Sequence, residues 1–277
     1  MRIAFTKMHG LGNDFLVMEA PSDAALPSPA QWRQLADRHT GVGFDQALVL
    51  EPPRVAGSAA HYRIFNADGG EVEQCGKGVR CIAHYLQMHG RKGVDGTLSM
   101  DGAGGPVLAR VLDDGGIAVD LGIPDFDPRA LPFAAAATEA TYTLAVLGEH
   151  LEFGAVAVGN PHAVVRVTAV ESAAVERIGR ALQAHPSFPR QVNVGFMQII
   201  DAGHIRLRVY ERGAGETMAC GTGACAAVAV GRNLGLLGVD VEVHVRGGRL
   251  GVHWEGPGQH IWLTGPTAVA YTGQADI

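Results

Sequence analysis

Lysine is scarce in this 277-residue sequence, which contains only Lys7, Lys77 and Lys92. The formal net charge is −6, and the cationic residues form no basic stripe along the chain. Nucleic-acid binding depends on clustered positive charge that neutralises phosphates. The composition therefore predicts that nucleic acid is not a partner.

Long apolar segments are also missing. The longest apolar run lies at residues 224–230 and is far shorter than the ~18 residues that a membrane-spanning helix needs. The first ten residues, MRIAFTKMHG, predict a strand and lack the apolar core of a signal peptide. We therefore expect no membrane partner and a cytoplasmic location.

Cysteine occurs four times, as Cys75, Cys81, Cys220 and Cys225. The spacings C-x5-C and C-x4-C fit neither paired zinc ligands nor a C-x-x-C redox motif. Cytoplasmic thiols are reduced by default. No site for a metal or an organic cofactor is evident in the sequence, so we expect none.

Glycine is abundant, at 38 of 277 residues, which is about twice the usual ~7%. This frequency indicates many tight turns and hence many short strands. Hydrophobic residues make up 47% and charged residues 18%, as in a globular chain. At about 150 residues per domain, the length predicts two domains.

A long-period internal repeat supports this division. Residues 71–87, EVEQCGKGVRCIAHYLQ, and 216–231, ETMACGTGACAAVAVG, share the order Glu, three residues, Cys, Gly, any residue, Gly. The pairs separated by 145 positions are Glu71 and Glu216, Cys75 and Cys220, Gly76 and Gly221, Gly78 and Gly223, and, less similar, Asn66 and Glu211. Asn13 and Asn160, and Gln46 and Asn193, are separated by 147 positions. A period near half the chain predicts two similar domains.

The predicted fold is α+β, with two pseudo-symmetric lobes, each a mostly antiparallel sheet wrapped around a central helix. We place the lobes at residues 1–119 and 120–266, with 267–277 packing back onto the first and the active site in the cleft between them. Residues 123–140 are expected to connect the lobes. Besides a helix after each glycine-flanked cysteine, the pattern predicts helices at 28–39, with Ser28 as N-cap, and 171–185. It predicts strands at 2–10, 46–53, 60–68, 155–167, 194–200 and 204–211, and turns at 113–116 and 246–248.

Cys75 and Cys220 stand in glycine brackets at predicted helix starts. Glycine allows close backbone approach, and the first N–H groups of a helix attract an anion such as a carboxylate. The helix dipole favours a thiolate by about 0.3–1 kcal/mol, which is too little to make the thiol a strong base. If the thiols remove a weakly acidic C–H proton, the same N–H groups must therefore also stabilise the carbanion by binding its carboxylate. One thiolate could remove a proton while the opposite thiol protonates the other face, which inverts a stereocentre. Cys81 and Cys225 are expected to be structural, because they lie inside the helices.

The amides of Asn13, Gln46, Asn66, Asn160 and Asn193 form a second group of candidates. Asparagine at a turn commonly has a structural role. Because four of these five residues form positional pairs across the repeats, a functional role is as well supported as a structural one. His162 has no counterpart in the first repeat and is a candidate to set protonation at a thiol. Adjacent Glu211 and Arg212 would hold an ammonium and a carboxylate in a cleft, or form an ordinary surface ion pair.

The sequence resembles the diaminopimelate epimerase family in four segments that span nearly the whole chain. They are KMHGLGNDF (7–15), NADGGEVEQCGKGVRC (66–81), GNPHAV (159–164) and YERGAGETMACGTGACA (210–226). The resemblance implies cofactor-independent epimerisation of LL- to meso-diaminopimelate, for lysine and peptidoglycan synthesis, by a homodimer. It implies that Cys75 and Cys220 are the two bases, assisted by His162 and Glu211. It implies substrate contacts at Asn13, Gln46, Asn66, Gly76, Lys77, Asn160, Asn193, Glu211, Arg212, Gly221 and Thr222.

Lys77 departs from the family, which usually has Asn at this position. We expect the position to act through its backbone N–H, which makes lysine compatible, and its charge would favour the Cys75 thiolate. One alternative is a related two-thiol racemase of the proline or hydroxyproline type, whose smaller substrate does not need the Glu211–Arg212 pair. Another is a redox sensor in which Cys75 and Cys220 form a disulfide.

Overall fold

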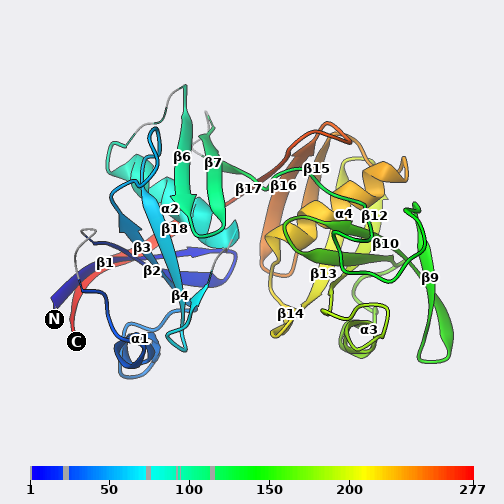
Figure 1. Cartoon of the computed structure of the whole chain (residues 1–277), viewed down its shortest axis with the longest axis horizontal. Helices are drawn as coiled ribbons and strands as arrows, with labels where there is room; N and C mark the ends of the chain where they lie inside the picture. The colour runs from blue at the N-terminus through cyan, green and yellow to red at the C-terminus, as the bar shows by residue number, and fades with distance from the viewer. Residues whose placement is uncertain (1, 21–24, 73–75, 92, 94, 113–115) are drawn as a thin grey trace. The chain divides into compact units, whose positions relative to one another are not determined.

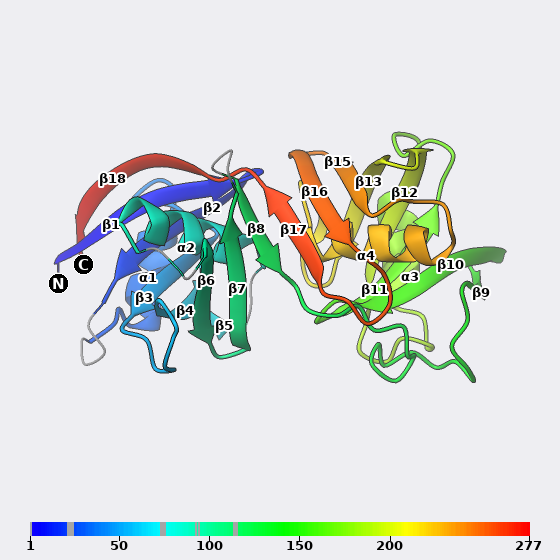
Figure 2. The same ribbon diagram turned by 90° about the horizontal axis from the view of Figure 1, so that it is seen from above.

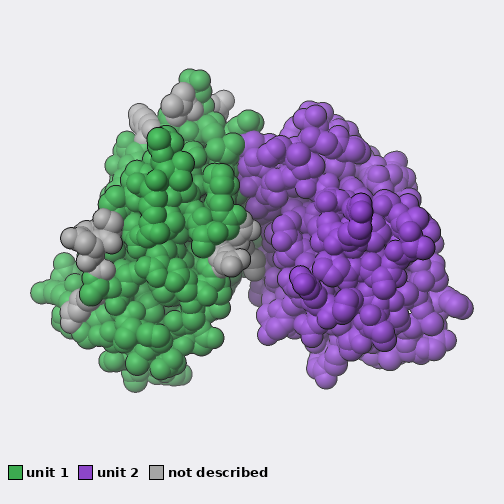
Figure 3. Space-filling view, viewed as in Figure 1, with its two compact units in different colours: residues 1–119, 265–277 green, residues 120–264 purple. Residues whose placement is uncertain are grey.

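The computed structural model describes all residues except 1, 21–24, 73–75, 92, 94 and 113–115 (Figure 1). The chain divides into two compact units, which Figure 3 shows in separate colours. The first comprises residues 1–119 and 265–277, and the second comprises residues 120–264. Each unit is described by itself below.

The first unit is built on one mixed sheet, with neighbouring strands in the order β18-β1-β2-β3-β4-β6-β7-β8. Short β5 pairs with β4. Among these pairings, β2–β3 and β4–β6 are parallel and the others are antiparallel. The last strand, β18, returns to lie beside β1 (Figure 2). The bounds are β1 Arg2–Gly10, β2 Asn13–Glu19, β3 Gln46–Glu51, β4 His61–Asn66, β5 Glu71–Val72, β6 Thr97–Gly102, β7 Gly105–Val111, β8 Ile117–Asp120 and β18 Ala268–Asp276.

Two helices pack against this sheet. Helix α2 (Gly76–Met88) contacts β1, β2, β3 and β7. Its buried apolar residues recur with the helical period, at Val79, Ile82, Ala83 and Leu86. Helix α1 (Pro29–Ala36) buries Trp32, whose ring stacks on that of Phe65 at 5.1 Å.

Helix α1 begins with a capping box. The backbone N–H of Gln31 donates to the Ser28 hydroxyl at 3.4 Å, and the Gln31 side chain accepts from the Ser28 N–H at 2.9 Å. This arrangement satisfies two of the N–H groups that a helix start leaves unpaired. The predicted N-cap is therefore confirmed, although the helix ends at Ala36 instead of residue 39.

The second unit repeats this arrangement. Its strands neighbour in the order β9-β10-β11-β12-β13-β15-β16-β17, with β14 beside β13. Only β11–β12 and β13–β15 are parallel among these pairings. The bounds are β9 Tyr142–Val146, β10 Glu149–Ala157, β11 Pro161–Arg166, β12 Asn193–Asp201, β13 His204–Glu211, β14 Gly215–Thr217, β15 Asp240–Val245, β16 Gly248–Trp254 and β17 Ile261–Gly265.

Helix α4 (Gly221–Asn233) is the central helix of the second unit and contacts β10, β11, β12, β13 and β16 (Figure 1). Residues 223–231 are buried without interruption, so the helix is covered on all faces. Helix α3 (Val175–Gln183) packs on β12 and β13. None of the helices in the described part combines the length and apolar character that a bilayer-spanning segment requires.

The sequence repeat is also a structural repeat. Helices α2 and α4 both have 13 residues and begin 145 positions apart. The parallel pair β2–β3 aligns Phe15 with Gln46, and β11–β12 aligns His162 with Asn193, which are the same repeat positions. The predicted α+β fold with two similar domains is therefore confirmed.

A bidentate ion pair recurs at the equivalent place in each unit. Arg63 Nε lies 2.7 Å from a carboxylate oxygen of Glu71, and Arg208 Nε lies 2.7 Å from one of Glu216. Each pair joins two neighbouring antiparallel strands, β4 to β5 and β13 to β14. The repeated glutamate before each cysteine is thus accounted for by a structural role.

Two sequence predictions were wrong. Residues 155–167 form the end of β10 and the whole of β11 instead of one strand, because Gly159 adopts φ +70° in the turn between them. Residues 123–140 do not simply connect the units. Leu131 and Phe133 are buried in the core of the second unit, where the Phe133 and Phe188 rings stack at 4.6 Å.

Replacing Ser28 with Ala should lower the free energy of unfolding by about 1 kcal/mol, because the capping box is lost. Urea denaturation measures the change. Ser172→Ala is the control, since this exposed hydroxyl donates only to the Ala169 carbonyl, at 3.3 Å. An equal loss in both variants would contradict the proposed role of the cap.

Candidate active site

Cys220 is the N-cap residue of α4. Its backbone is extended (φ −130°, ψ 113°), and its carbonyl accepts the first helical hydrogen bond, from Ala224 N at 2.9 Å. The backbone N–H groups of the next three residues have no acceptor within the helix, as at any helix start. The Cys220 side chain is buried. The sequence therefore places a buried thiol beside a natural anion-binding position.

A carboxylate faces this thiol. The Cys220 Sγ–H donates to Glu211 Oε2 at 3.1 Å, and Sγ lies 3.6 Å from the Thr222 hydroxyl. Glu211 is the last residue of β13, and its Oε1 accepts a hydrogen bond from the hydroxyl of Thr217 on β14. Because Thr217 fixes one carboxylate oxygen, the other is directed at the sulfur. This geometry lets Glu211 take the proton from the thiol.

His162 lies on the other side of Thr222. Its Nε2 is 2.8 Å from Asn160 Oδ1 and 3.0 Å from Thr222 Oγ1. Its Nδ1 is buried and has no hydrogen-bond partner among the described residues. Burial, with a smaller contribution from the Arg212 charge, lowers the pKa of His162 to about 3. The imidazole is therefore neutral at neutral pH and offers one donor and one acceptor.

Asn193 and Arg212 complete this edge of the second unit. The parallel register of β11 and β12 aligns Asn193 with His162. Buried Asn193 accepts a hydrogen bond through Oδ1 from the backbone N–H of Arg212, at 2.9 Å. The Arg212 side chain is exposed and donates to the Arg190 carbonyl at 3.2 Å. The second unit thus gathers its predicted residues, namely Asn160, His162, Asn193, Glu211, Arg212, Cys220, Gly221 and Thr222.

The first unit places its predicted amides at the equivalent edge. Gln46 lies opposite Asn66 in the β3–β4 register, and its Nε2 donates to Asn66 Oδ1 at 2.9 Å. Gln46 Oε1 is buried without a hydrogen-bond partner among the described residues. Asn13 begins β2, and its Nδ2 donates to Asp45 Oδ2 at 2.8 Å.

The thiol of the first repeat is not described. Cys75 lies outside the described residues, as do the side-chain surroundings of Gly76 and Lys77, although α2 begins at Gly76. The two-cysteine site therefore stays a prediction. Among the described residues, no group of three His, Cys, Asp or Glu side chains is placed to hold a metal ion.

The sequence did not indicate a role for Thr217 or Asp45. Thr217 lies between the repeated Glu216 and Cys220, and only the pairing of β13 with β14 brings it to Glu211. Asp45 directly precedes Gln46, and its contact with Asn13 depends on β2 and β3 lying side by side. Asn13 and Asp45 are 32 positions apart, and the contact between Thr217 and Glu211, six positions apart, depends on the pairing of β13 with β14, so no sequence motif indicated either role.

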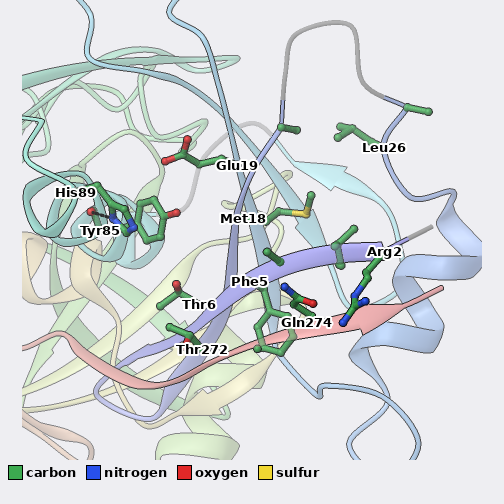
Figure 4. A pocket seen from close by; sticks show the side chains of 15 residues that line it. Arg2, Phe5, Thr6, Met18, Glu19, Leu26, Tyr85, His89, Thr272 and Gln274 are labelled. Atoms are coloured by element: carbon green, nitrogen blue, oxygen red, sulfur yellow. Dashed lines mark hydrogen bonds between the residues drawn. The ribbon is translucent and has the colours of Figure 1, made fainter.

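A cavity of about 810 Å³ lies elsewhere in the first unit (Figure 4). It is bordered by β1, β2, β18 and the end of α2, with Phe5, Met18, Glu19, Tyr85 and His89 among its lining. Its described lining includes none of the predicted site residues. The candidate site is therefore distinct from this cavity.

Comparison with known proteins gives a consistent family assignment. A family model described as diaminopimelate epimerase matches residues 5–126 and 154–270. A curated diaminopimelate epimerase from Nitrosomonas europaea is 50% identical over 279 residues and is aligned over the full length of both chains.

Solved structures with the same fold are more distant in sequence. A hydroxyproline epimerase from Agrobacterium vitis has a TM-score of 0.68 at 17% identity and covers 99% of this chain and 92% of its own. A PhzF-family phenazine biosynthesis protein from Bacillus anthracis has the same score and identity, with full coverage of both chains. At such identities the similarity shows the fold alone.

Replacing Gly223 with Ala should reduce turnover by at least about tenfold, because its Cβ would lie only 3.3 Å from Cys220 Sγ and 3.0 Å from Val209 Cγ2. Steady-state kinetics with diaminopimelate measures the loss. Gly251→Ala is the control, because its Cβ would make an ordinary contact of 3.5 Å with Thr264. Unchanged turnover in Gly223→Ala would contradict the tight packing proposed around the thiol.

Acidification should destabilise the second unit through His162. Between pH 6.5 and about pH 3, His162 is protonated in the unfolded state but stays neutral in the folded protein, because burial lowers its pKa. The free energy of unfolding should therefore fall by about 1.4 kcal/mol per pH unit through this window. His162→Gln should remove this contribution, whereas the exposed control His150→Gln should follow the wild-type profile. Denaturation curves at pH 7 and pH 5 test the difference, and parallel profiles for all three proteins would refute it.

Proposed function

The chain belongs to the diaminopimelate epimerase family, and on this premise we propose that it converts LL- to meso-diaminopimelate by proton transfer between two thiols. The observation that supports this mechanism best is the 3.1 Å contact between Cys220 and Glu211 at the start of α4. The contact brings together a thiol, a proton acceptor and the first N–H groups of a helix, which have no acceptor within that helix.

The proposed reaction requires two proton transfers and no redox step. In one direction, the Cys220 thiolate takes the α-proton, and the C–H electron pair stays on the α-carbon. The Cys75 thiol then donates its proton to the opposite face, which leaves Cys75 as the thiolate. The reverse direction exchanges the roles of the sulfurs. Substrate and product have the same atoms, so the reaction needs no net oxidant or reductant, and we propose that the two thiols carry it out without a cofactor.

Stabilisation of the carbanion must account for most of the rate. A helix dipole contributes about 0.3–1 kcal/mol to a nearby negative charge, which is small against the barrier to removing a weakly acidic C–H proton. The free N–H groups of Gly221 and Thr222 can bind the substrate carboxylate, onto which the carbanion charge spreads. Because Gly76 and Lys77 are the repeat positions of Gly221 and Thr222, we propose the same role for their backbone N–H groups. Position 77 then acts through its backbone, so a lysine side chain is compatible with substrate binding.

Diaminopimelate has an amino-acid group at each end, and the end that does not react gives the charged residues Glu211 and Arg212 a role. Exposed Arg212 provides a guanidinium for a carboxylate, which it can bind in a bidentate manner. Glu211 can serve both an ammonium and the Cys220 thiol. Asn13, Gln46, Asn66, Asn160 and Asn193 supply uncharged donors and acceptors around the substrate. A proline-sized substrate has no second head for such a pair, so we favour diaminopimelate over proline or hydroxyproline.

The family resemblance also supports the setting of the reaction. We propose that the protein is a cytoplasmic homodimer and that the two lobes of each chain close over one substrate molecule. Its place would be the synthesis of lysine and of peptidoglycan precursors.

Deuterium exchange tests both the substrate and the two thiols. In heavy water and reducing buffer, the wild-type protein should incorporate deuterium at the α-carbon of diaminopimelate as it epimerises. Cys75→Ala and Cys220→Ala should each lower epimerisation by at least about 10³-fold, because each removes one of the two acid–base groups. Mass spectrometry measures deuterium, and chiral chromatography measures the isomers.

Cys225→Ala is the matched control, since Cys225 is buried within α4, five residues beyond Cys220. It should retain turnover. Full activity in either Cys75→Ala or Cys220→Ala would disprove the two-base scheme. Exchange with proline alone would support a proline-type racemase, and no exchange with either amino acid would support the redox alternative.

A further inference from the structure

Asp45 connects the three predicted substrate amides of the first unit. Its carboxylate accepts from Asn13 Nδ2 at 2.8 Å and from the Asp14 backbone N–H at 3.1 Å. Its carbonyl accepts from the N–H of Ala67, the residue after Asn66, at 3.2 Å. Gln46 is its neighbour in the chain. One residue therefore contacts or adjoins the segments that carry all three amides.

Charged partners hold Asp45 in place. Arg38 Nη2 lies 2.8 Å from Asp45 Oδ1 and 2.8 Å from Asp14 Oδ1, so the guanidinium bridges the two carboxylates. Buried Lys7 Nζ lies 2.6 Å from Asp14 Oδ2. The bonds from Arg38 and Lys7 outweigh burial and lower the pKa of Asp14 well below its usual range. We name Lys7, Asn13, Asp14, Arg38 and Asp45 the Asp45 network.

The second unit forms the same fold without this network. The repeat position of Asp45 is Val192, which is fully buried, and that of Asp14 is Pro161. Neither side chain can accept a hydrogen bond, yet β11 and β12 keep the parallel register of β2 and β3. The backbone architecture therefore does not require the Asp45 network, which indicates a role at the site.

The contact with Asp45 fixes the orientation of the Asn13 amide. An ionised carboxylate only accepts hydrogen bonds, so it must face the NH₂ end of the amide. Within the described part of the chain, the carbonyl oxygen of Asn13 is then directed away from Asp45 and can act toward a ligand only as an acceptor. An ammonium group fits this oxygen, whereas a carboxylate would be repelled.

We propose that Asp45 is a positioning residue that makes Asn13 present its carbonyl oxygen to an ammonium group of the amino-acid substrate. This inference rests on the proposed function for the identity of the substrate. It adds a residue to the site and assigns to Asn13 the substrate group that it recognises.

A double-mutant cycle tests the coupling through diaminopimelate kinetics. Asp45→Ala should raise KM about tenfold and change kcat by less than about threefold, because a charge-assisted bond that fixes binding geometry is lost. In an Asn13→Ala background, Asp45→Ala should change KM by less than about twofold. The same KM factor in both backgrounds would overturn the proposal. Asp45→Asn, which keeps one acceptor oxygen, should lie between wild type and Asp45→Ala.

Asp37→Ala is the matched control, because it removes a carboxylate from the same unit, next to Arg38 in sequence. Asp37 is the C-cap residue of α1, and its carboxylate accepts from the Thr40 N–H at 2.7 Å in the turn that follows the helix. The variant should lose stability while KM stays at the wild-type value. A KM increase equal to that of Asp45→Ala would mean that lost stability, not amide orientation, explains the effect.

A substrate-free measurement separates this inference from the proposed function. In ¹⁵N-labelled protein, the side-chain amide signals of Asn13 should shift on Asp45→Ala and stay in place on Asp37→Ala. Unmoved signals in Asp45→Ala would overturn the positioning role, whatever the substrate. Failure of wild-type protein to exchange deuterium into diaminopimelate would instead refute the proposed function and leave the amide result to stand alone.

Discussion

The parallel pairing of β2 with β3 and of β11 with β12, in sheets whose strands are mostly antiparallel, determines where the polar residues gather. Strands β2 and β3 run in the same direction, so both begin at one edge, and antiparallel β4 ends there. Strands β11, β12 and β13 follow the same rule. The edge therefore collects two strand starts and one strand end, and a shift of one residue in register would turn these side chains to the other face.

The helix that follows this edge can begin there because small residues allow it to be buried. Gly154 leaves room for Val230 of α4, since a Cβ on this glycine would lie 2.3 Å from Val230 Cγ1. The run of alanine, glycine and valine in α4 then packs under the sheet without long side chains. As a result, Cys220 is held at the helix start away from water, where contacts with N–H groups and a carboxylate are stronger than at the surface.

Local sequence patterns predicted many of the elements and supplied the residues of the candidate site. The repeat offset identified α2 and α4, and Ser28 identified the start of α1. Features set by tertiary contacts were not predictable in the same way. Segment 123–140 is rich in proline and alanine and resembles a linker, but its role depends on the packing of Leu131 and Phe133 in an aromatic core that includes Phe188, far along the chain. The roles of Thr217 and Asp45 likewise arise from strand neighbours.

The two repeats share a backbone architecture but differ at several positions of the candidate site. Glu211 has Asn66 as its counterpart, His162 has Phe15, and Asp45 has Val192. A site with two identical halves would bind diaminopimelate equally well in two opposed orientations, because it could not tell the reacting head from the distant one. Different hydrogen-bonding groups at equivalent positions remove this ambiguity. In the proposed mechanism, divergence of the side chains on a repeated backbone would let a duplicated fold keep two similar thiols while it orients an unsymmetrically bound substrate.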